Sequence, residues 1–216
     1  MTSDWALYVV TDESVAHGRS HLEVAQEAIA GGADAVQLRD KCRSARDLLA
    51  IARAIRPIAA AAGARFIIND RLDLALLAAD GVHLGQGDLP IEAARRLAPP
   101  PFIIGVSVGS VEEALRAERE GADYVAISPV FATSSKDDAG PGHGLETVAA
   151  VQAAVDIPVL AIGGIDHSNA ADVIRAGADG CAVISCVVSA PEIAVAARSL
   201  RECIALALSE QTPESL

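Results

Sequence analysis

The sequence predicts a single-domain (β/α)8 TIM barrel, and a repeat, an alternation and a spacing each support this fold. Turns of glycine, alanine and aspartate recur at 32–34, 79–81, 121–123 and 177–179, each between a helical stretch and an apolar run. Short β-branched runs alternate with helical stretches along the chain, which implies parallel strands covered by helices. The 216 residues divide into eight units of about 27, enough for one strand and one helix with short connections.

The eight strand candidates are short apolar runs, typical of strands buried on both faces. In chain order they span residues 7–11, 35–38, 65–68, 82–84, 102–106, 124–127, 159–162 and 180–184. Helical periodicity follows them, most clearly at 21–30, 45–61, 111–120, 169–176 and 191–208. We therefore expect one barrel domain over residues 1–208 and a polar tail over residues 209–216.

The composition limits the function as well as the fold. A hydrophobic share of 51% and a mean hydropathy of +0.34 exclude a disordered chain. The net charge of −12 and the 3% of aromatic residues argue against a nucleic-acid surface, which needs basic and stacking side chains. Without a long apolar run, a basic leader or a Cys-x-x-Cys pair, we expect a cytoplasmic protein with reduced cysteines and no membrane contact. Its expected partners are small molecules, and the sequence leaves a homo-oligomer open.

Polar residues follow the second strand, at the end of the barrel that carries the chemistry. Because side chains alternate between the faces of a strand, Gln37, Arg39 and Lys41 share the face opposite Val36 and Leu38. Cations in such a position need an anion or a carboxylate nearby. This segment predicts an anion-binding site, with a structural ion pair or a solvated loop as the alternative.

Carboxylates follow the next two strands. Asp70 comes directly after the third strand and Asp88 follows the fourth, so the two neighbouring loops can bring them together. Mg²⁺ in proteins is commonly held by one or two carboxylates plus substrate phosphates. The pair predicts a magnesium site, although Asp70 could instead cap a helix N-terminus. His83 alternates with apolar neighbours in the fourth strand and is expected to be a satisfied interior histidine.

The segment at 105–109, Gly-Val-Ser-Val-Gly, matches the G-x-S-x-G nucleophile elbow of hydrolases around Ser107. His143 or His167 could then act as the base of a serine hydrolase. The pattern is short, and the eight-unit repeat differs from the order of elements in those hydrolases. We therefore favour a hydrogen-bonding role for Ser107 and keep the hydrolase as an alternative.

The last three loops carry features of phosphate binding. The long loop at 131–144 offers hydroxyl groups and a lysine, and it predicts either a lid over an anionic ligand or a solvated polar loop. Gly163 and Gly164 follow the seventh strand, and Ser185 follows the eighth. Because these two loops form the common phosphate site of such barrels, we expect a phosphate there.

Taken in order, seven segments resemble the thiamine phosphate synthase family. They are QLRDK, IINDRLDLA, DGVHLGQGDLP, GVSVGS, SPVFATSSK, AIGGI and VIS, and the resemblance extends from about residue 7 to about residue 204. It implies a barrel enzyme of thiamine biosynthesis, a transferase that joins hydroxymethylpyrimidine diphosphate to thiazole phosphate and releases pyrophosphate. The implied route passes through a pyrimidinyl-methyl cation, and the implied cofactor is Mg²⁺.

The resemblance also implies roles for individual residues, each at a position that matches a family motif. The residues implied to hold the pyrimidine diphosphate are Gln37, Leu38, Arg39, Asp40, Lys41, Asn69, Ser107 and Lys136. The implied catalytic residues are Arg39, Lys41, Ser107 and Lys136. Asp70 and Asp88 match the family's magnesium ligands. The implied thiazole phosphate contacts are Thr133, Ser134, Ser135, Gly164, Ile184 and Ser185.

Two positions depart from the family pattern. Gly109 stands where the family usually has histidine, and Ser135 stands where it usually has threonine. Serine keeps the hydroxyl group, whereas Gly109 removes a ring from the loop after the fifth strand. Two other functions stay open: a thiazole tautomerase-like paralogue, against which Gly109 and Asp88 argue, and a non-catalytic phosphate-ligand-binding protein.

Overall fold

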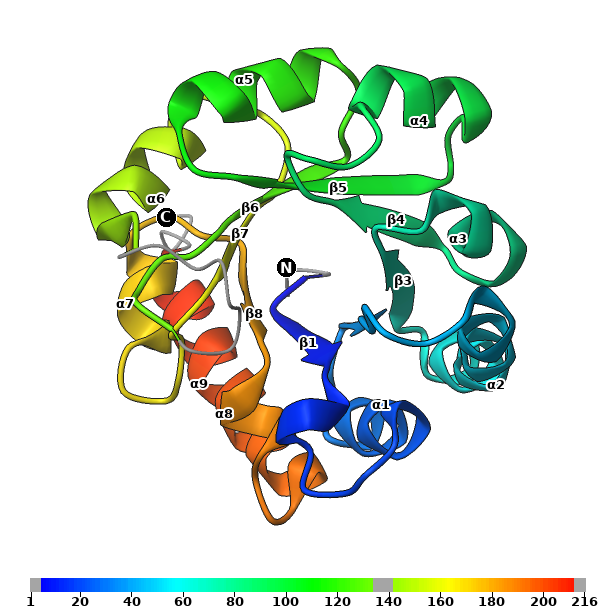
Figure 1. Cartoon of the computed structure of the whole chain (residues 1–216). Coiled ribbons are helices and arrows are strands. Elements are labelled where there is room, and N and C mark those ends of the chain that lie inside the picture. Colours follow the sequence, from blue (N-terminus) through cyan, green and yellow to red (C-terminus); the bar gives the residue numbers. More distant parts are fainter. Residues whose placement is uncertain (1–4, 134–141, 212–216) are drawn as a thin grey trace.

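Eight parallel strands close into a barrel in the computed structural model of the chain, which describes residues 5–133 and 142–211 (Figure 1). The strands pair in sequence order, and the eighth pairs with the first. They are β1 (Leu7–Thr11), β2 (Ala35–Leu38), β3 (Arg65–Asn69), β4 (Gly81–Leu84), β5 (Ile103–Val108), β6 (Tyr124–Ile127), β7 (Val159–Ile162) and β8 (Gly180–Val183). The predicted barrel is confirmed, with every strand close to its expected place.

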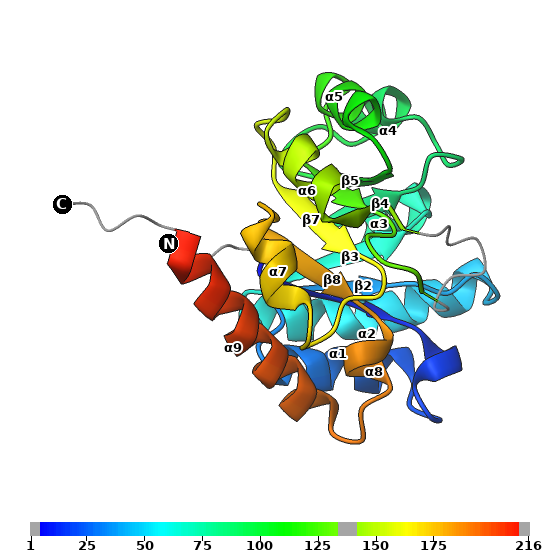
Figure 2. The same ribbon diagram turned by 90° about the vertical axis from the view of Figure 1, so that its left-hand side faces the viewer.

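Helices form the outer layer around the ring of strands (Figure 1). In chain order they are the 3-10 helix η1 (Glu13–Val15), α1 (His21–Ala30), α2 (Ala45–Ala62), α3 (Leu72–Ala78), α4 (Ile91–Leu97), α5 (Val111–Arg119), α6 (Gly144–Gln152), α7 (Ala170–Arg175), α8 (Ser185–Val188) and α9 (Ile193–Gln211). The last of these packs against α1 and α7, and so spans the seam where β8 meets β1 (Figure 2). No described helix is both long enough and apolar enough to cross a bilayer.

The expected polar tail begins inside a helix. Helix α9 continues to Gln211, so residues 209–211 belong to it. The helix has five buried positions spaced at helical intervals. Because that face packs against the barrel, the helix is stable enough to continue beyond its last apolar residues. Residues 212–216 lie outside the part of the chain that the structure describes.

Aromatic side chains fill the middle of the barrel. The ring centroids of Trp5 and Tyr124 lie 4.7 Å apart, and those of Tyr8 and Tyr124 lie 6.2 Å apart. Gly105 pairs with Tyr124 in the β5–β6 ladder, and a Cβ atom on it would stand 1.9 Å from the Cζ atom of that ring. The glycine is therefore needed at this position, because any side chain would expel the tyrosine from the interior.

Four aspartates each bind the preceding strand at two points. The backbone N–H of the aspartate donates to a carbonyl oxygen of that strand, and the carboxylate accepts the N–H of the same residue. With these two donor–acceptor distances, the pairs are Asp34 with Leu7 (2.9 and 2.9 Å), Asp80 with Phe66 (2.8 and 2.8 Å), Asp123 with Ile104 (2.7 and 2.6 Å) and Asp179 with Val159 (2.8 and 2.8 Å). The aspartate of the repeated turn therefore clamps each odd-numbered strand to the even-numbered strand that follows.

Asp179→Ala tests one clamp, because no ion pair joins Asp179 to another residue of the described part of the chain. The N–H of Val159, a residue only 1% exposed, would lose its acceptor. We expect the free energy of unfolding to fall by about 1–3 kcal/mol, measured by urea unfolding at neutral pH. The matched control is Asp156→Ala, in the exposed connection before the same strand, with an expected change below about 0.5 kcal/mol. Equal effects of the two substitutions would contradict the role of the clamp.

Candidate active site

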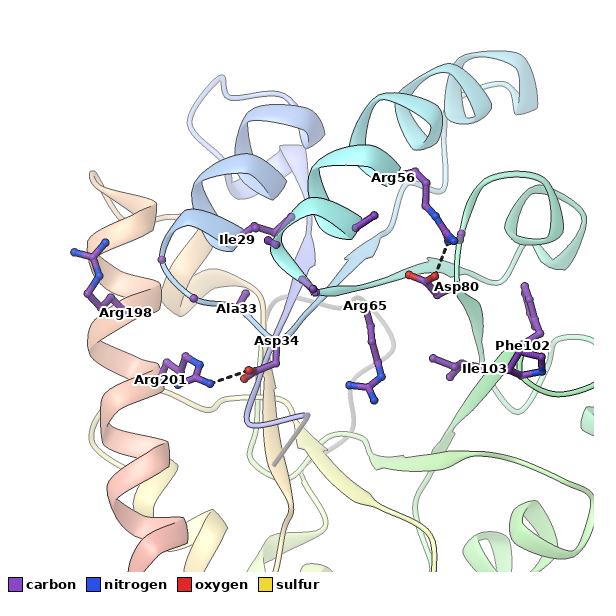
Figure 3. A pocket seen from close by; sticks show the side chains of 18 of the residues that line it. Ile29, Ala33, Asp34, Arg56, Arg65, Asp80, Phe102, Ile103, Arg198 and Arg201 are labelled. Atoms are coloured by element: carbon purple, nitrogen blue, oxygen red, sulfur yellow. Dashed lines mark hydrogen bonds and ion pairs between the residues drawn. The ribbon is translucent and has the colours of Figure 1, made fainter. Parts of the chain in front are cut away.

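Cavities open at both ends of the barrel. The larger one, about 1140 Å³, lies at the N-terminal edge of the strands and is lined by two aspartates of the clamps, Asp34 and Asp80 (Figure 3). Arg201 pairs with Asp34 at 2.9 Å and Arg56 pairs with Asp80 at 2.7 Å, as the dashed lines in Figure 3 mark. Because these charges bind one another and the carboxylates also hold the strands, the residues at this end stabilise the barrel.

The cavity at the opposite end, about 450 Å³, brings together residues from the C-terminal ends of four successive strands, β2 to β5, and from the loops after them. The predicted site residues that line it are Gln37, Arg39, Lys41, Asn69, Asp70, Asp88 and Ser107. A smaller cavity beside it is lined by four of the predicted phosphate contacts, Thr133, Gly164, Ile184 and Ser185. The two cavities share Ser128, Pro129, Ile162 and Ala182, so ligands bound in them would be immediate neighbours.

Five of the predicted site residues do not line either cavity or cannot be placed. Leu38 is 1% exposed and belongs to the hydrophobic core. Asp40 turns toward His21 and Arg43, with which it forms hydrogen bonds. Ser134, Ser135 and Lys136, with most of the predicted lid, lie outside the described residues.

Asp70 and Asp88 form a carboxylate pair. Burial is the main cause that raises the pKa of Asp70 to about 6, and the hydrogen bond and charge of Asp88 add to it. Lys41 and Arg39 act in the opposite direction without cancelling the shift. Asp88 is held by the N–H of Gly85, at 2.7 Å from its Oδ2 atom. Two carboxylates in this arrangement favour either a proton or a cation between them.

The backbone at Asp70 is unusual for a residue with a side chain. Its φ is 59°, in the left-handed region where non-glycine residues are uncommon. Helix α3 begins at Leu72 without any side-chain cap, so Asp70 does not cap it. Strained backbone of this kind clusters at functional sites, where it aims a side chain that regular structure would turn elsewhere. Here the strain directs the carboxylate toward Asp88 and the cavity.

The two cations of the loop after β2 differ in their surroundings. Arg39 donates to Asp12 at 3.1 Å, and the two side chains are only 14% and 15% exposed. Lys41 lines the same cavity and forms no hydrogen bond or ion pair with any described residue. The cavity therefore contains one cation that is held in place and one that is free to bind an anion.

A chain of hydrogen bonds crosses the floor of the cavity. The amide of Gln37 donates to the hydroxyl oxygen of Tyr8 at 2.7 Å, and that hydroxyl lies 3.2 Å from the hydroxyl of Tyr124. Tyr124 lies 2.9 Å from Nδ1 of His83, whose Nε2 lies 3.0 Å from Oγ of Ser107. Burial raises the pKa of both tyrosines, so each keeps a hydrogen to donate onward. His83 is thus the satisfied interior histidine that its position predicted.

The order of donors argues against a hydrolytic Ser107. If every hydroxyl hydrogen is used, Tyr8 donates to Tyr124 and Tyr124 donates to His83, which leaves the imidazole hydrogen on Nε2 for Ser107. A general base must accept the serine hydrogen instead of donating to the serine oxygen. His167, one of the bases considered from the sequence, bonds to Ser199 at 3.1 Å and so lies elsewhere.

The other candidate base, His143, occupies the space beside Gly109. A Cβ atom on Gly109 would lie 2.7 Å from Cε1 and 2.8 Å from Nε2 of the His143 ring. The loop after β5 therefore does have an imidazole next to it, although the ring comes from the start of α6. A side chain at residue 109 would displace this ring.

Sequence reasoning missed the tyrosines of the cavity floor. Tyr8 lies within a strand that was correctly expected, and Tyr124 begins another. The available signal was their rarity, because the chain has only two tyrosines and both fall in predicted strands. Periodicity alone cannot tell which of these side chains meet inside a barrel.

Comparison with known proteins adds independent evidence. A family model described as thiamine monophosphate synthase matches residues 7–187. The chain is 62% identical over 205 residues to a thiamine-phosphate synthase of Methanoculleus marisnigri, covering 94% of this chain and 97% of the relative. It is 60% identical over 202 residues to one of Methanoregula boonei, covering 93% and 94%.

A solved structure agrees with the sequence matches. The thiamine phosphate pyrophosphorylase of Pyrococcus furiosus is 41% identical, with a TM-score of 0.88, and the match covers 95% of this chain and 98% of that one. Relatives with these names are transferases of thiamine biosynthesis, and the matches favour neither the hydrolase, the tautomerase-like paralogue nor the non-catalytic binder. The chain belongs to the thiamine monophosphate synthase family.

Proposed function

We propose that the chain is a magnesium-dependent transferase that joins hydroxymethylpyrimidine diphosphate to thiazole phosphate and releases pyrophosphate. The observation that carries this proposal is the adjacency of two cavities of different chemistry. One contains two cations and two carboxylates, which suits a metal-bound diphosphate. The other is lined by Thr133, Gly164 and Ser185, whose hydroxyl and backbone groups suit a monophosphate.

Asp70 and Asp88 fit Mg²⁺ by the chemistry of their oxygen atoms. Their mutual repulsion, which contributes to the raised pKa of Asp70, is relieved by a divalent cation. When bound, the ion would supply stabilisation for the negative charge that develops on the departing diphosphate. The Glu13, His21 and Asp40 cluster is a poorer candidate, because Arg43 already pairs with both of its carboxylates.

The remaining residues bind and orient the two substrates. Arg39 and Lys41, with Lys136 beyond the described residues, stabilise the diphosphate as the carbon–oxygen bond breaks and its electron pair leaves with pyrophosphate. The thiazole nitrogen then supplies the electron pair of the new carbon–nitrogen bond. Ser107 accepts a hydrogen bond from His83, and Gln37 and Asn69 complete the proposed pyrimidine contacts. No protein nucleophile is required. Excluding water protects the pyrimidinyl-methyl cation that the broken bond leaves behind.

We also propose a reducing, cytoplasmic location for the enzyme. All four cysteines are free, at Cys42, Cys181, Cys186 and Cys203. Cys42 is exposed, which suits a compartment that keeps thiols reduced.

Asp88→Asn tests the metal and diphosphate site. The change preserves the size of the side chain but removes its charge, so we expect kcat for pyrophosphate release to fall at least about a hundredfold. Thiazole phosphate binding uses other loops and should stay near the wild-type value in calorimetry. The matched control is Asp73→Asn, on the exposed face of α3, which should leave both quantities unchanged. A wild-type protein that releases no pyrophosphate from both substrates and Mg²⁺ would overturn the proposed function.

Asp70→Asn isolates the pH dependence of the carboxylate pair in metal-free protein. Because the pKa of Asp70 rises from 3.8 to about 6 on folding, the folded chain holds a proton there that the unfolded chain has lost. Its stabilising effect is complete below pH 3.8 and is lost as the pH rises to about 6. We therefore expect the difference in unfolding free energy, wild type minus Asp70→Asn, to decline across this interval. Urea unfolding of both proteins in the presence of a chelator measures this difference at each pH. Unfolding free energies that change in parallel with pH in the two proteins would contradict the prediction.

A further inference from the structure

A buried histidine outside the cavity connects the first two loops of the barrel. His21 begins helix α1 and is 1% exposed. Its Nδ1 atom lies 2.7 Å from Oγ1 of Thr11, at the end of β1, and its Nε2 atom lies 3.1 Å from Oδ2 of Asp40, after β2. The ring therefore joins the two loops through both of its nitrogen atoms.

The hydrogen bonds around Thr11 assign the hydrogens of this ring. The backbone N–H of Arg39 donates to Oγ1 of Thr11, at a long distance of 3.4 Å. Thr11 is fully buried, so its own hydroxyl hydrogen needs an acceptor, and Nδ1 of His21 is the acceptor beside it. With Nδ1 as the acceptor for Thr11, the imidazole carries its hydrogen on Nε2 and donates it to Asp40. Every donor and acceptor of this relay is satisfied in that arrangement.

Asp40 closes the turn that contains Lys41. Its Oδ1 atom accepts the N–H groups of Cys42 at 2.7 Å and of Arg43 at 2.8 Å. Burial opposes ionisation, but these bonds and that of His21 lower the pKa of Asp40 to about 2. The carboxylate is thus a charged anchor for the turn, with the two cavity cations on either side of it in the sequence.

The arrangement does not suit a metal ion. Ligand atoms of Glu13, His21 and Asp40 lie within 4.8 Å of one another. However, Arg43 donates to both carboxylates, and the assigned imidazole presents a hydrogen to Asp40. A cation would have to displace the guanidinium and remove that hydrogen.

We propose that His21 is a positioning residue for the diphosphate site. Its ring holds Asp40 in place, and this anchor sets the direction in which Arg39 and Lys41 enter the cavity. Arg43 is 40% exposed and its ion pairs are weakened by solvent, whereas His21 is buried and bonded at both nitrogens. The inference rests on the proposed function in one respect, namely that this cavity binds the diphosphate.

Binding of inorganic pyrophosphate with Mg²⁺, measured by calorimetry on the full chain, tests the proposal without requiring turnover. His21→Leu removes both hydrogen bonds, and we expect the pyrophosphate Kd to rise about tenfold, equivalent to about 1.4 kcal/mol. His21→Gln keeps an amide donor for Asp40 and should recover most of the affinity. Val24→Ala is the matched control, because Val24 is fully buried on the same helix and its apolar side chain forms no hydrogen bond with Asp40, and it should leave Kd unchanged.

Steady-state kinetics supply a second readout. For His21→Leu we expect KM for the pyrimidine diphosphate to rise while KM for thiazole phosphate stays near the wild-type value. An unchanged pyrophosphate Kd in His21→Leu, or an equal loss in Val24→Ala, would overturn the positioning role. If wild-type protein binds pyrophosphate but makes no product, and His21→Leu still weakens that binding, the proposed function fails while the role of His21 stands.

Discussion

Closure of the barrel depends on its N-terminal edge, where a backbone N–H in the first two residues of a strand can lack a partner. A buried N–H group without an acceptor costs about 1–3 kcal/mol. The carboxylates of Asp34, Asp80, Asp123 and Asp179 supply the missing acceptors, each from the segment that leads into the next strand. The ring is thus assembled from four clamped pairs of strands. Because each clamp sets where a strand starts, it also sets which residues meet at the far edge.

The cavity floor follows from this register. His83 lies level with Asn69 on one side and Gly105 on the other, and the missing side chain of Gly105 admits Tyr124. The polar groups of the interior then satisfy one another, as buried groups must. Unbalanced charge is left at the rim, where Lys41 is free among the described residues and Asp70 shares its surroundings with another carboxylate. A strongly acidic protein can therefore still offer a local site for anions and a metal ion.

Much of this organisation could be predicted from the sequence because its causes are local. The barrel follows from alternating short strands and helices, and the edge at which the chemistry gathers follows from parallel strands. Asp70 and Ser107 reach one cavity because their strands end at the same edge. Asp40 differs: it belongs to the same short motif as Lys41 but turns away from the cavity, because its partner His21 comes from another segment, the start of α1.

The sequence by itself determined the fold class, the order of the strands and most of the side chains around the cavity, since periodicity and turn residues act over a few positions. Only the tertiary structure decided which side chains meet across the barrel. Tyr8 and Tyr124 are 116 residues apart, and their contact requires the closed ring and the gap at Gly105. His143 reaches Gly109 from another loop for the same reason. Such contacts depend on packing between distant segments, which no local pattern records.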